Sequence, residues 1–111
     1  MSSTSVLLAN EPRAYRETIA VALGMLCPDK IVMVAEPDRL DEFIDEHHPH
    51  VVLCSHLTKT VEEQVPTWAV LYPDGSGETI VQIDGRRMKI PEIQLNGIVR
   101  LIQEPNDLSL S

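Results

Sequence analysis

Short apolar runs alternate with amphipathic segments along the first half of the chain. Residues 6–9 (VLLA), 31–35 (IVMVA) and 51–54 (VVLC) are continuous aliphatic runs, typical of strands buried on both faces of a parallel sheet. Between these runs, apolar residues recur at spacings of three and four, which predicts two helices with one buried face each. The expected inward positions are Tyr15, Ile19, Leu23 and Leu26, and then Leu40, Phe43, Ile44 and, as a candidate, His47. The order β-α-β-α-β with short connections predicts a parallel sheet with right-handed crossovers.

The second half of the chain has a different pattern. A short helix is expected over 58–65, with Thr58 or Thr60 as its N-cap. Strands are expected over 68–72, 79–83 and 86–90; the gap between the first two is too short for a helical crossover, so they should form an antiparallel hairpin. A last helix should follow Pro91. Its expected inward residues are Leu95, Ile98, Leu101 and Ile102, and 105–111 are expected to form a frayed tail.

Length and charge limit the class of protein. The 111 residues suffice for a single domain (1–111), with an ordered core expected over about residues 5–104. Lys and Arg number 9 against 17 Asp and Glu, so the formal net charge is -8, which disfavours nucleic acid and anionic membrane surfaces as partners. No apolar stretch is long enough to span a bilayer, and the N-terminus lacks a secretory pattern. Cys27 and Cys54 are expected to be free thiols, so a cytoplasmic location is expected.

Two stretches carry a resemblance to a known family. The stretch VLLANEPRAYRETI (6–19) contains an aliphatic strand, then a polar pair, then a helix with a sequence close to PxxRExL. The stretch HHPHVVLCSHL (47–57) contains a helix end, a Pro and another aliphatic strand. Over residues 5–58 the chain resembles the receiver domain of two-component response regulators. The resemblance implies a three-layer, doubly wound α/β fold (flavodoxin- or receiver-like), here with a hairpin and a C-terminal helix that make the sheet mixed. It also implies a place in phosphorelay signal transduction.

The residues that carry receiver chemistry are replaced in this chain. The family's acidic pair falls on Asn10 and Glu11, its phosphoacceptor Asp falls on Ser55, and its Lys-Pro step is echoed by Lys89, with one extra residue before Pro91. Phosphoryl transfer in the family needs carboxylates, both as nucleophile and as Mg²⁺ ligands. Asn10 and Ser55 supply neutral oxygens only. These positions therefore resemble a degenerate phosphorylation site, and no catalytic residue, metal or cofactor is expected.

We therefore expect a non-catalytic signalling or regulatory interaction module rather than an enzyme. Its partner would be a protein or a second copy in a homodimer. Candidate interface residues in the hairpin region are Trp68 and Tyr72, because aromatic side chains are enriched at interfaces, and Arg86 and Arg87, because their basic cluster could bind an acidic partner surface or an anion. With so few aromatic residues in the chain, Trp68 is also expected to be at least partly core.

Two alternatives stay open. The carboxyl ends of the three parallel strands should bring Asn10, Glu36 and Ser55 together, where they could bind a small polar ligand or an anion, or support weak enzyme activity. An active atypical receiver would need another phosphoacceptor, but no Asp lies beside the third strand's end.

Two further motifs have ordinary explanations. The residues His47, His48, His50, Cys54 and His56 suggest zinc, but their spacing matches no common zinc motif. The segment DGSGE (74–78) resembles a phosphate-binding loop, but a strand rather than a helix follows it. Helix-end residues and a hairpin loop are the expected roles.

Overall fold

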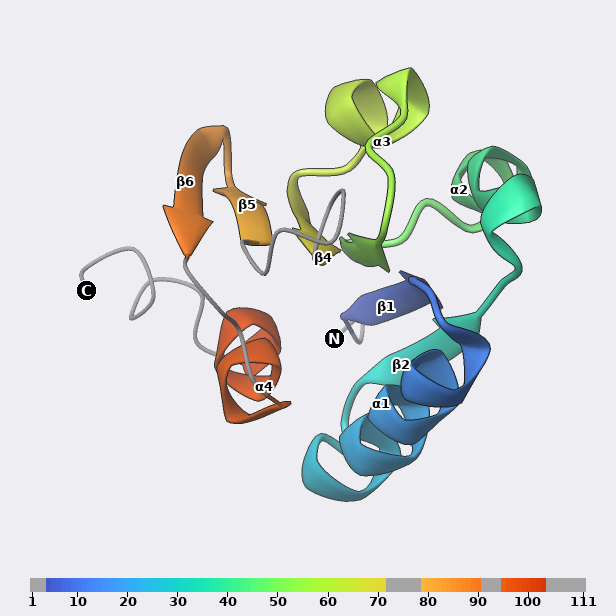
Figure 1. Cartoon of the computed structure of the whole chain (residues 1–111), viewed down its shortest axis with the longest axis vertical. Helices are drawn as coiled ribbons and strands as arrows, with labels where there is room; N and C mark the ends of the chain where they lie inside the picture. Colours follow the sequence, from blue (N-terminus) through green and yellow to red (C-terminus); the bar gives the residue numbers. More distant parts are fainter. Residues whose placement is uncertain (1–3, 72–78, 91–94, 104–111) are drawn as a thin grey trace.

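Six strands form one mixed sheet in the order β2-β1-β3-β4-β5-β6 (Figure 1). The computed structural model describes residues 4–71, 79–90 and 95–103. The first four strands in this order are parallel, whereas β5 is antiparallel to β4 and β6 is antiparallel to β5. Their bounds are β1 (Ser5–Ala9), β2 (Ile31–Val34), β3 (Val51–Cys54), β4 (Thr67–Leu71), β5 (Thr79–Ile83) and β6 (Arg86–Ile90).

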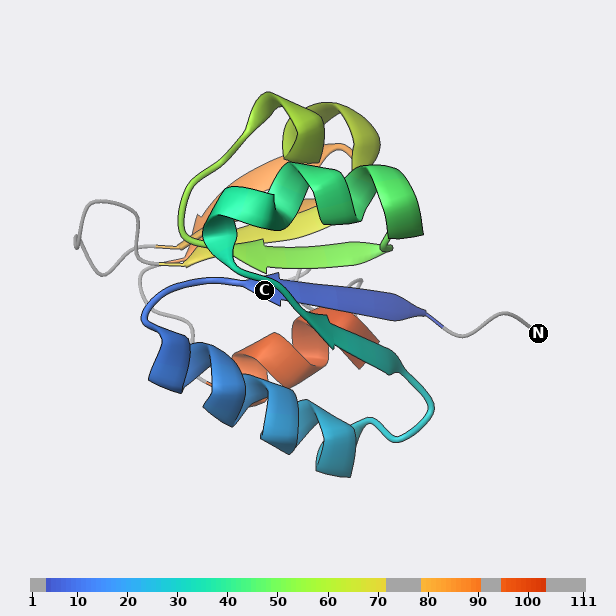
Figure 2. The ribbon, with the colours of Figure 1, turned by 90° about the vertical axis from the view of Figure 1, so that its right-hand side faces the viewer.

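Helices cover both faces of the sheet (Figure 2). One face carries α1 (Arg13–Leu26) and α4 (Leu95–Gln103), which pack with β-strand residues into one apolar core. The other face carries η1 (Pro37–Arg39), α2 (Leu40–His47) and α3 (Lys59–Gln64) over a second core. The predicted α/β class with a mixed sheet is confirmed. Within the described residues, no helix combines the length and the apolar character that crossing a bilayer requires.

The burial of the three N-terminal strands was predicted only in part. β1 and β3 are buried along their whole length, as their aliphatic sequences indicate. β2 is not a buried strand: it lies at the edge of the sheet, and Ile31 and Val34 are 53% and 42% exposed. The aliphatic run predicts a strand, but its position in the sheet depends on which strands pair, which the run itself does not specify.

The buried side of α1 is shifted from the predicted one. Ile19 and Leu23 are buried as expected, but Leu26 is 54% exposed at the end of the helix. Arg16 is buried instead, because it lies three residues before Ile19 and seven before Leu23, on the same side of the helix. In α2, Leu40 and Ile44 are buried and Phe43 is partly buried. His47 is exposed, contrary to its candidate place on that face.

The second half agrees with the predicted hairpin. β4 and β5 pair antiparallel from Thr67 opposite Ile83 to Leu71 opposite Thr79. Asp84 and Gly85 join β5 to β6 with φ values of 47° and 88°, as a two-residue turn with two left-handed positions requires.

The two helices of this half also follow the predictions. Thr58 caps α3, since its side chain accepts a hydrogen bond from the Val61 N–H. In α4 the buried residues include Ile98, Leu101 and Ile102. The predictions for Tyr72, for 74–78, for the Leu95 side chain and for 105–111 lie outside the described residues.

Candidate functional site

The carboxyl ends of β1, β2 and β3 bring polar residues to one edge of the sheet. Asn10 follows β1, Glu36 follows β2 and Ser55 follows β3, and these strands are parallel neighbours. The Glu11 N–H donates a hydrogen bond of 2.7 Å to Ser55 Oγ, which joins the ends of β1 and β3. The expected convergence of these positions is therefore present.

Arg16 from α1 occupies the same edge. Its Nη1 donates to the carbonyl oxygen of Asn10 at 3.4 Å, and its Nη2 donates to Glu36 Oε1 at 3.3 Å. The side chain of Arg16 is 2% exposed, whereas that of Glu36 is 59% exposed. A buried guanidinium therefore links the end of β1 to the end of β2.

The side chain of Asn10 is enclosed without hydrogen bonds. Asn10 is 0% exposed, and neither its Oδ1 nor its Nδ2 has a partner among the described residues. The Nε of Arg16 is likewise buried without a partner there. A polar group removed from water in this way carries a desolvation cost of about 1–3 kcal/mol. The strand-end site therefore holds unused hydrogen-bonding capacity next to a positive charge.

The donor atoms at this edge do not fit a divalent cation. Mg²⁺ binds through carboxylate and water oxygens in octahedral geometry. Glu11 offers one exposed carboxylate, the carboxylate of Glu36 is paired with Arg16, and the Ser55 hydroxyl oxygen already accepts a hydrogen bond. Across the described ranges, no three His, Cys, Asp or Glu side chains are grouped so that they could hold a metal. The charge of Arg16 further opposes a second cation.

Arg16 is the site residue that the sequence analysis missed. Its signal was the spacing: a charged residue stands three and seven positions before two inward-facing aliphatic residues, Ile19 and Leu23. A charge on a buried helix face is rarely left without a partner, so the position of Arg16 indicates an acidic partner at a strand end. Glu36 satisfies that requirement.

Lys89 lies far from the other degenerate-site positions. It stands in a cross-strand row with Ala9, Cys54, Val70 and Ile80, at the outer end of the sheet. Four strand spacings of about 4.8 Å separate it from β1, which is roughly 19 Å. The structure therefore does not bring Lys89 together with Asn10, Glu11 and Ser55.

Trp68 and Arg87 form a contact on the opposite side of the sheet from α1. Trp68 is 0% exposed, so its predicted place in the core is confirmed, and its ring offers no exposed surface in a single chain. The guanidinium carbon of Arg87 lies 5.1 Å from the ring centroid. Arg87 also donates to Gln82 at 3.3 Å and lies 3.8 Å from Glu62 Oε1 of α3. Arg86 is exposed on the other face of β6. An interface through these residues stays a prediction.

The residues that suggested zinc lie in different surroundings. His50 Nδ1 accepts a hydrogen bond of 3.0 Å from the Ser5 N–H, so it takes part in the start of β1. His48 ends α2 in the left-handed region with φ of 47°. Cys54 is buried, and this burial raises the pKa of its thiol to about 12. Metals bind the thiolate, and burial disfavours the thiolate of Cys54, so this residue is a poor metal ligand.

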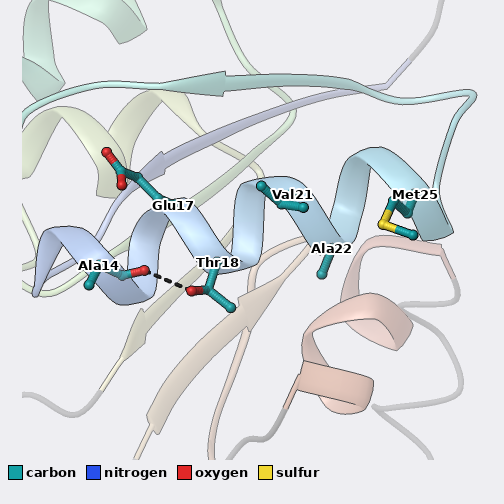
Figure 3. A pocket seen from close by; sticks show the side chains of 6 residues that line it. All are labelled: Ala14, Glu17, Thr18, Val21, Ala22 and Met25. Carbon is teal, nitrogen blue, oxygen red and sulfur yellow. Dashed lines mark hydrogen bonds between the residues drawn. The ribbon is translucent and has the colours of Figure 1, made fainter.

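An open groove runs along the outer side of α1 (Figure 3). It is lined by Ala14, Glu17, Thr18, Val21, Ala22 and Met25. The Thr18 hydroxyl is satisfied by the Ala14 carbonyl oxygen at 2.9 Å, so the lining is mainly apolar. Among the described residues that line the groove, no two form a pair with acid–base or nucleophilic chemistry.

The chain matches no family model, no curated protein and no solved structure.

Proposed function

We propose that this chain is a non-catalytic interaction module of cytoplasmic signalling, built on a receiver-like layout. The strand order β2-β1-β3-β4 agrees with the first four strands of the flavodoxin-like order. The resemblance of residues 5–58 to receivers supports the same layout. The two free, buried cysteines are compatible with a reducing compartment.

The observation that carries the proposal is the buried guanidinium of Arg16 at the strand ends. In an active receiver this edge would hold a divalent cation and a phosphorylated carboxylate. Here a positive charge is already bound to Asn10 O and Glu36 Oε1. The charge holds the strand ends together without a cation from solution. A module of this kind acts through its surfaces and not through phosphorylation.

The surroundings of Ser55 argue against an enzyme. A hydroxyl nucleophile needs a neighbouring base to take its proton. In the described part of the chain, the hydrogen-bond partner of Ser55 Oγ is the backbone N–H of Glu11, which cannot act as a base.

A solution NMR titration tests the proposal. Amide signals of Asn10, Glu11 and Ser55 are followed while Mg²⁺ and beryllofluoride, a mimic of the phosphoryl group, are added. We expect these amides to stay unshifted at millimolar ligand. Joint, saturable shifts would show a working phosphoryl site and contradict the proposal.

A pair of variants isolates the effect of Arg16. Asn10→Asp/Ser55→Asp restores the acidic donors but keeps the guanidinium, so Mg²⁺ should still bind poorly. Adding Arg16→Met removes the competing charge, and the same amides should then shift with Mg²⁺. Equal responses of the two variants would show that Arg16 does not exclude the cation.

Anion binding at the strand ends is the second candidate function. It is favoured by the Nε of Arg16 and the amide of Asn10, which have no partner in the part of the chain that the structure describes and can both donate hydrogen bonds. Inorganic phosphate is the probe. If the Arg16 Nε–H signal shifts and saturates with phosphate while Mg²⁺ has no effect, the site binds anions.

A further inference from the structure

The two edges of the sheet differ in charge. β6 carries Arg86, Arg87 and Lys89, the type of side chain that keeps an edge strand from pairing with other chains. β2 has the sequence IVMV without a charge, and Ile31 and Val34 are about half exposed. Within the described ranges, no strand pairs with the outer side of β2. A bare apolar edge is a template for an added strand.

Alternate backbone groups of β2 point away from β1. The Ile31 N–H donates to Thr4 O at 3.0 Å, and the Ala35 N–H donates to Leu8 O at 2.9 Å. Every second residue of a parallel strand bonds to the same neighbour, so the N–H and C=O groups of Val32 and Val34 face outward. These groups are the ones to which a further strand would bond.

We propose that the chain forms a twofold dimer in which β2 pairs antiparallel with β2 of a second copy, with Met33 on the axis. The inference rests on the proposed interaction function and names its partner. Val32 of each copy then lies opposite Val34 of the other, and these residues exchange the outward-facing hydrogen bonds. The result is one continuous sheet across both copies.

Charge complementarity selects this register. With Met33 on the axis, Lys30 lies opposite Glu36 of the second copy, and twofold symmetry repeats the pair at the other end. An axis at Val32 would place Lys30 opposite Val34, and an axis at Val34 would place Glu36 opposite Val32. The carboxylate of Glu36 keeps 59% of its side-chain area exposed beside Arg16. Lys30 pairs with Asp29 at 3.3 Å in the single chain and its side chain is 18% exposed, so in the dimer it would turn from Asp29 toward Glu36 of the second copy.

The position of α1 agrees with the same axis. α1 packs on the face of the sheet that carries Val6, Leu8 and Val32. Two copies of α1 would lie antiparallel and about two strand spacings apart, roughly 10 Å, which is an ordinary contact distance between helices. The dimer would therefore form a helix pair as well as a strand pair.

The outer side of α1 offers an apolar surface for that contact. Val21 and Met25 are 65% and 77% exposed. Figure 3 shows Glu17 and Val21 on the side of α1 nearer to β2. A Cβ added at Gly24 would meet nothing within 4 Å in a single chain, which leaves room for close approach by a second helix. The second copy would cover this surface.

Sedimentation equilibrium of the full chain and of two matched variants tests the dimer. We expect twice the chain mass of 12.4 kDa for the native chain. Val34→Lys puts a charge on the edge and should give the monomer mass. Leu57→Lys makes the same change of charge at another exposed apolar residue, 37% exposed, and should leave the dimer intact. A monomeric native chain, a dimeric Val34→Lys, or a monomeric Leu57→Lys would each overturn the inference.

Cysteine cross-linking tests the register. Two Met33→Cys residues on the axis would form a non-hydrogen-bonded pair with Cα atoms about 4.5 Å apart, within disulfide range. Two Val34→Cys residues would lie roughly 8 Å apart, beyond that range. Oxidation should link the first variant and not the second. Linking of Val34→Cys alone, or of Met88→Cys on β6 instead, would overturn the proposed axis.

The two proposals fail separately. If the chain is a monomer and does not respond to Mg²⁺ and beryllofluoride, the proposed dimer is wrong, whereas the proposed non-catalytic module stands with a different partner. If the chain is a dimer and binds the phosphoryl mimic, the proposed function is wrong, whereas the proposed β2–β2 interface stands.

Discussion

Two polar side chains inside the strand-end site cost stability. Asn10 and the Nε of Arg16 are buried without partners in the described part of the chain. Arg16 recovers part of its desolvation cost through Asn10 O and Glu36, whereas the amide of Asn10 recovers none there. At the scale of single residues, the buried polar atoms of the strand-end site therefore lower the stability of the fold.

Replacing Asn10 with an apolar residue of similar shape should stabilise the chain. Asn10→Leu removes two unsatisfied polar atoms, so we expect the free energy of unfolding to rise by about 1–3 kcal/mol. Urea denaturation followed by Trp68 fluorescence measures the change. A loss of stability would show that the amide makes hydrogen bonds in solution.

Cys54 makes stability depend on alkaline pH. Burial raises the pKa of its thiol from the ordinary 9.0 to about 12. Below pH 9 the thiol is neutral in both the folded and the unfolded chain, so its contribution is complete. Above pH 9 the unfolded thiol ionises and the folded one does not, so stability should fall between pH 9 and about 12. Cys54→Ala should show a smaller fall in the same denaturation series.

At the scale of elements, local patterns predicted most of the secondary structure. Aliphatic runs and the Thr58 cap each depend on neighbours in sequence, and the structure confirms them. The edge position of β2, the exposure of Leu26 and the distance of Lys89 depend on which elements pair. Pairing is decided by contacts between distant segments, which periodicity does not encode.

The candidate site was likewise predicted only in part from the sequence. The convergence of Asn10, Glu36 and Ser55 followed from parallel strand order and was predicted. The burial of Arg16 was not, because the helix was interpreted through its apolar positions alone. Its partner Glu36 lies 20 residues away in sequence.

Arg87 should hold β6 to the rest of the sheet. Its guanidinium lies over Trp68 and near Glu62 of α3, so it connects the edge strand to a helix. Arg87→Ala should lower the free energy of unfolding by about 0.5–1 kcal/mol and shift Trp68 emission to longer wavelength. Arg86→Ala, on the opposite face, should change neither. Equal effects would show that the contact with Trp68 contributes nothing specific.

At the scale of the whole molecule, the distance over which charges interact at low salt is comparable to the size of the protein. The formal net charge is -8, and the molecule measures 30 × 29 × 28 Å. The Debye length is about 30 Å at 0.01 M salt and about 8 Å at 0.15 M. At low salt, each charge therefore interacts with charges across the entire molecule.

Added salt should stabilise the fold. Raising NaCl from about 0.01 to 0.15 M screens the net repulsion among the acidic residues, so the melting temperature should rise. Calorimetry at both salt concentrations measures it, and a matched sucrose series separates screening from solvent exclusion. A falling melting temperature would show that local ion pairs such as Arg16–Glu36 outweigh the net repulsion.

The reversal of strand direction between β4 and β5 bears on how the chain folds. β4 pairs with β5 and β5 pairs with β6, each with the next strand in sequence, whereas Val6 of β1 pairs with Val51 of β3. Closing a long loop costs more entropy than closing a short one, and nonlocal pairing slows folding. The second half can therefore assemble as a local meander. We expect the pairing of β1 with β3 to limit the rate of folding, and the β3–β4 contact to join the two halves into one cooperative unit.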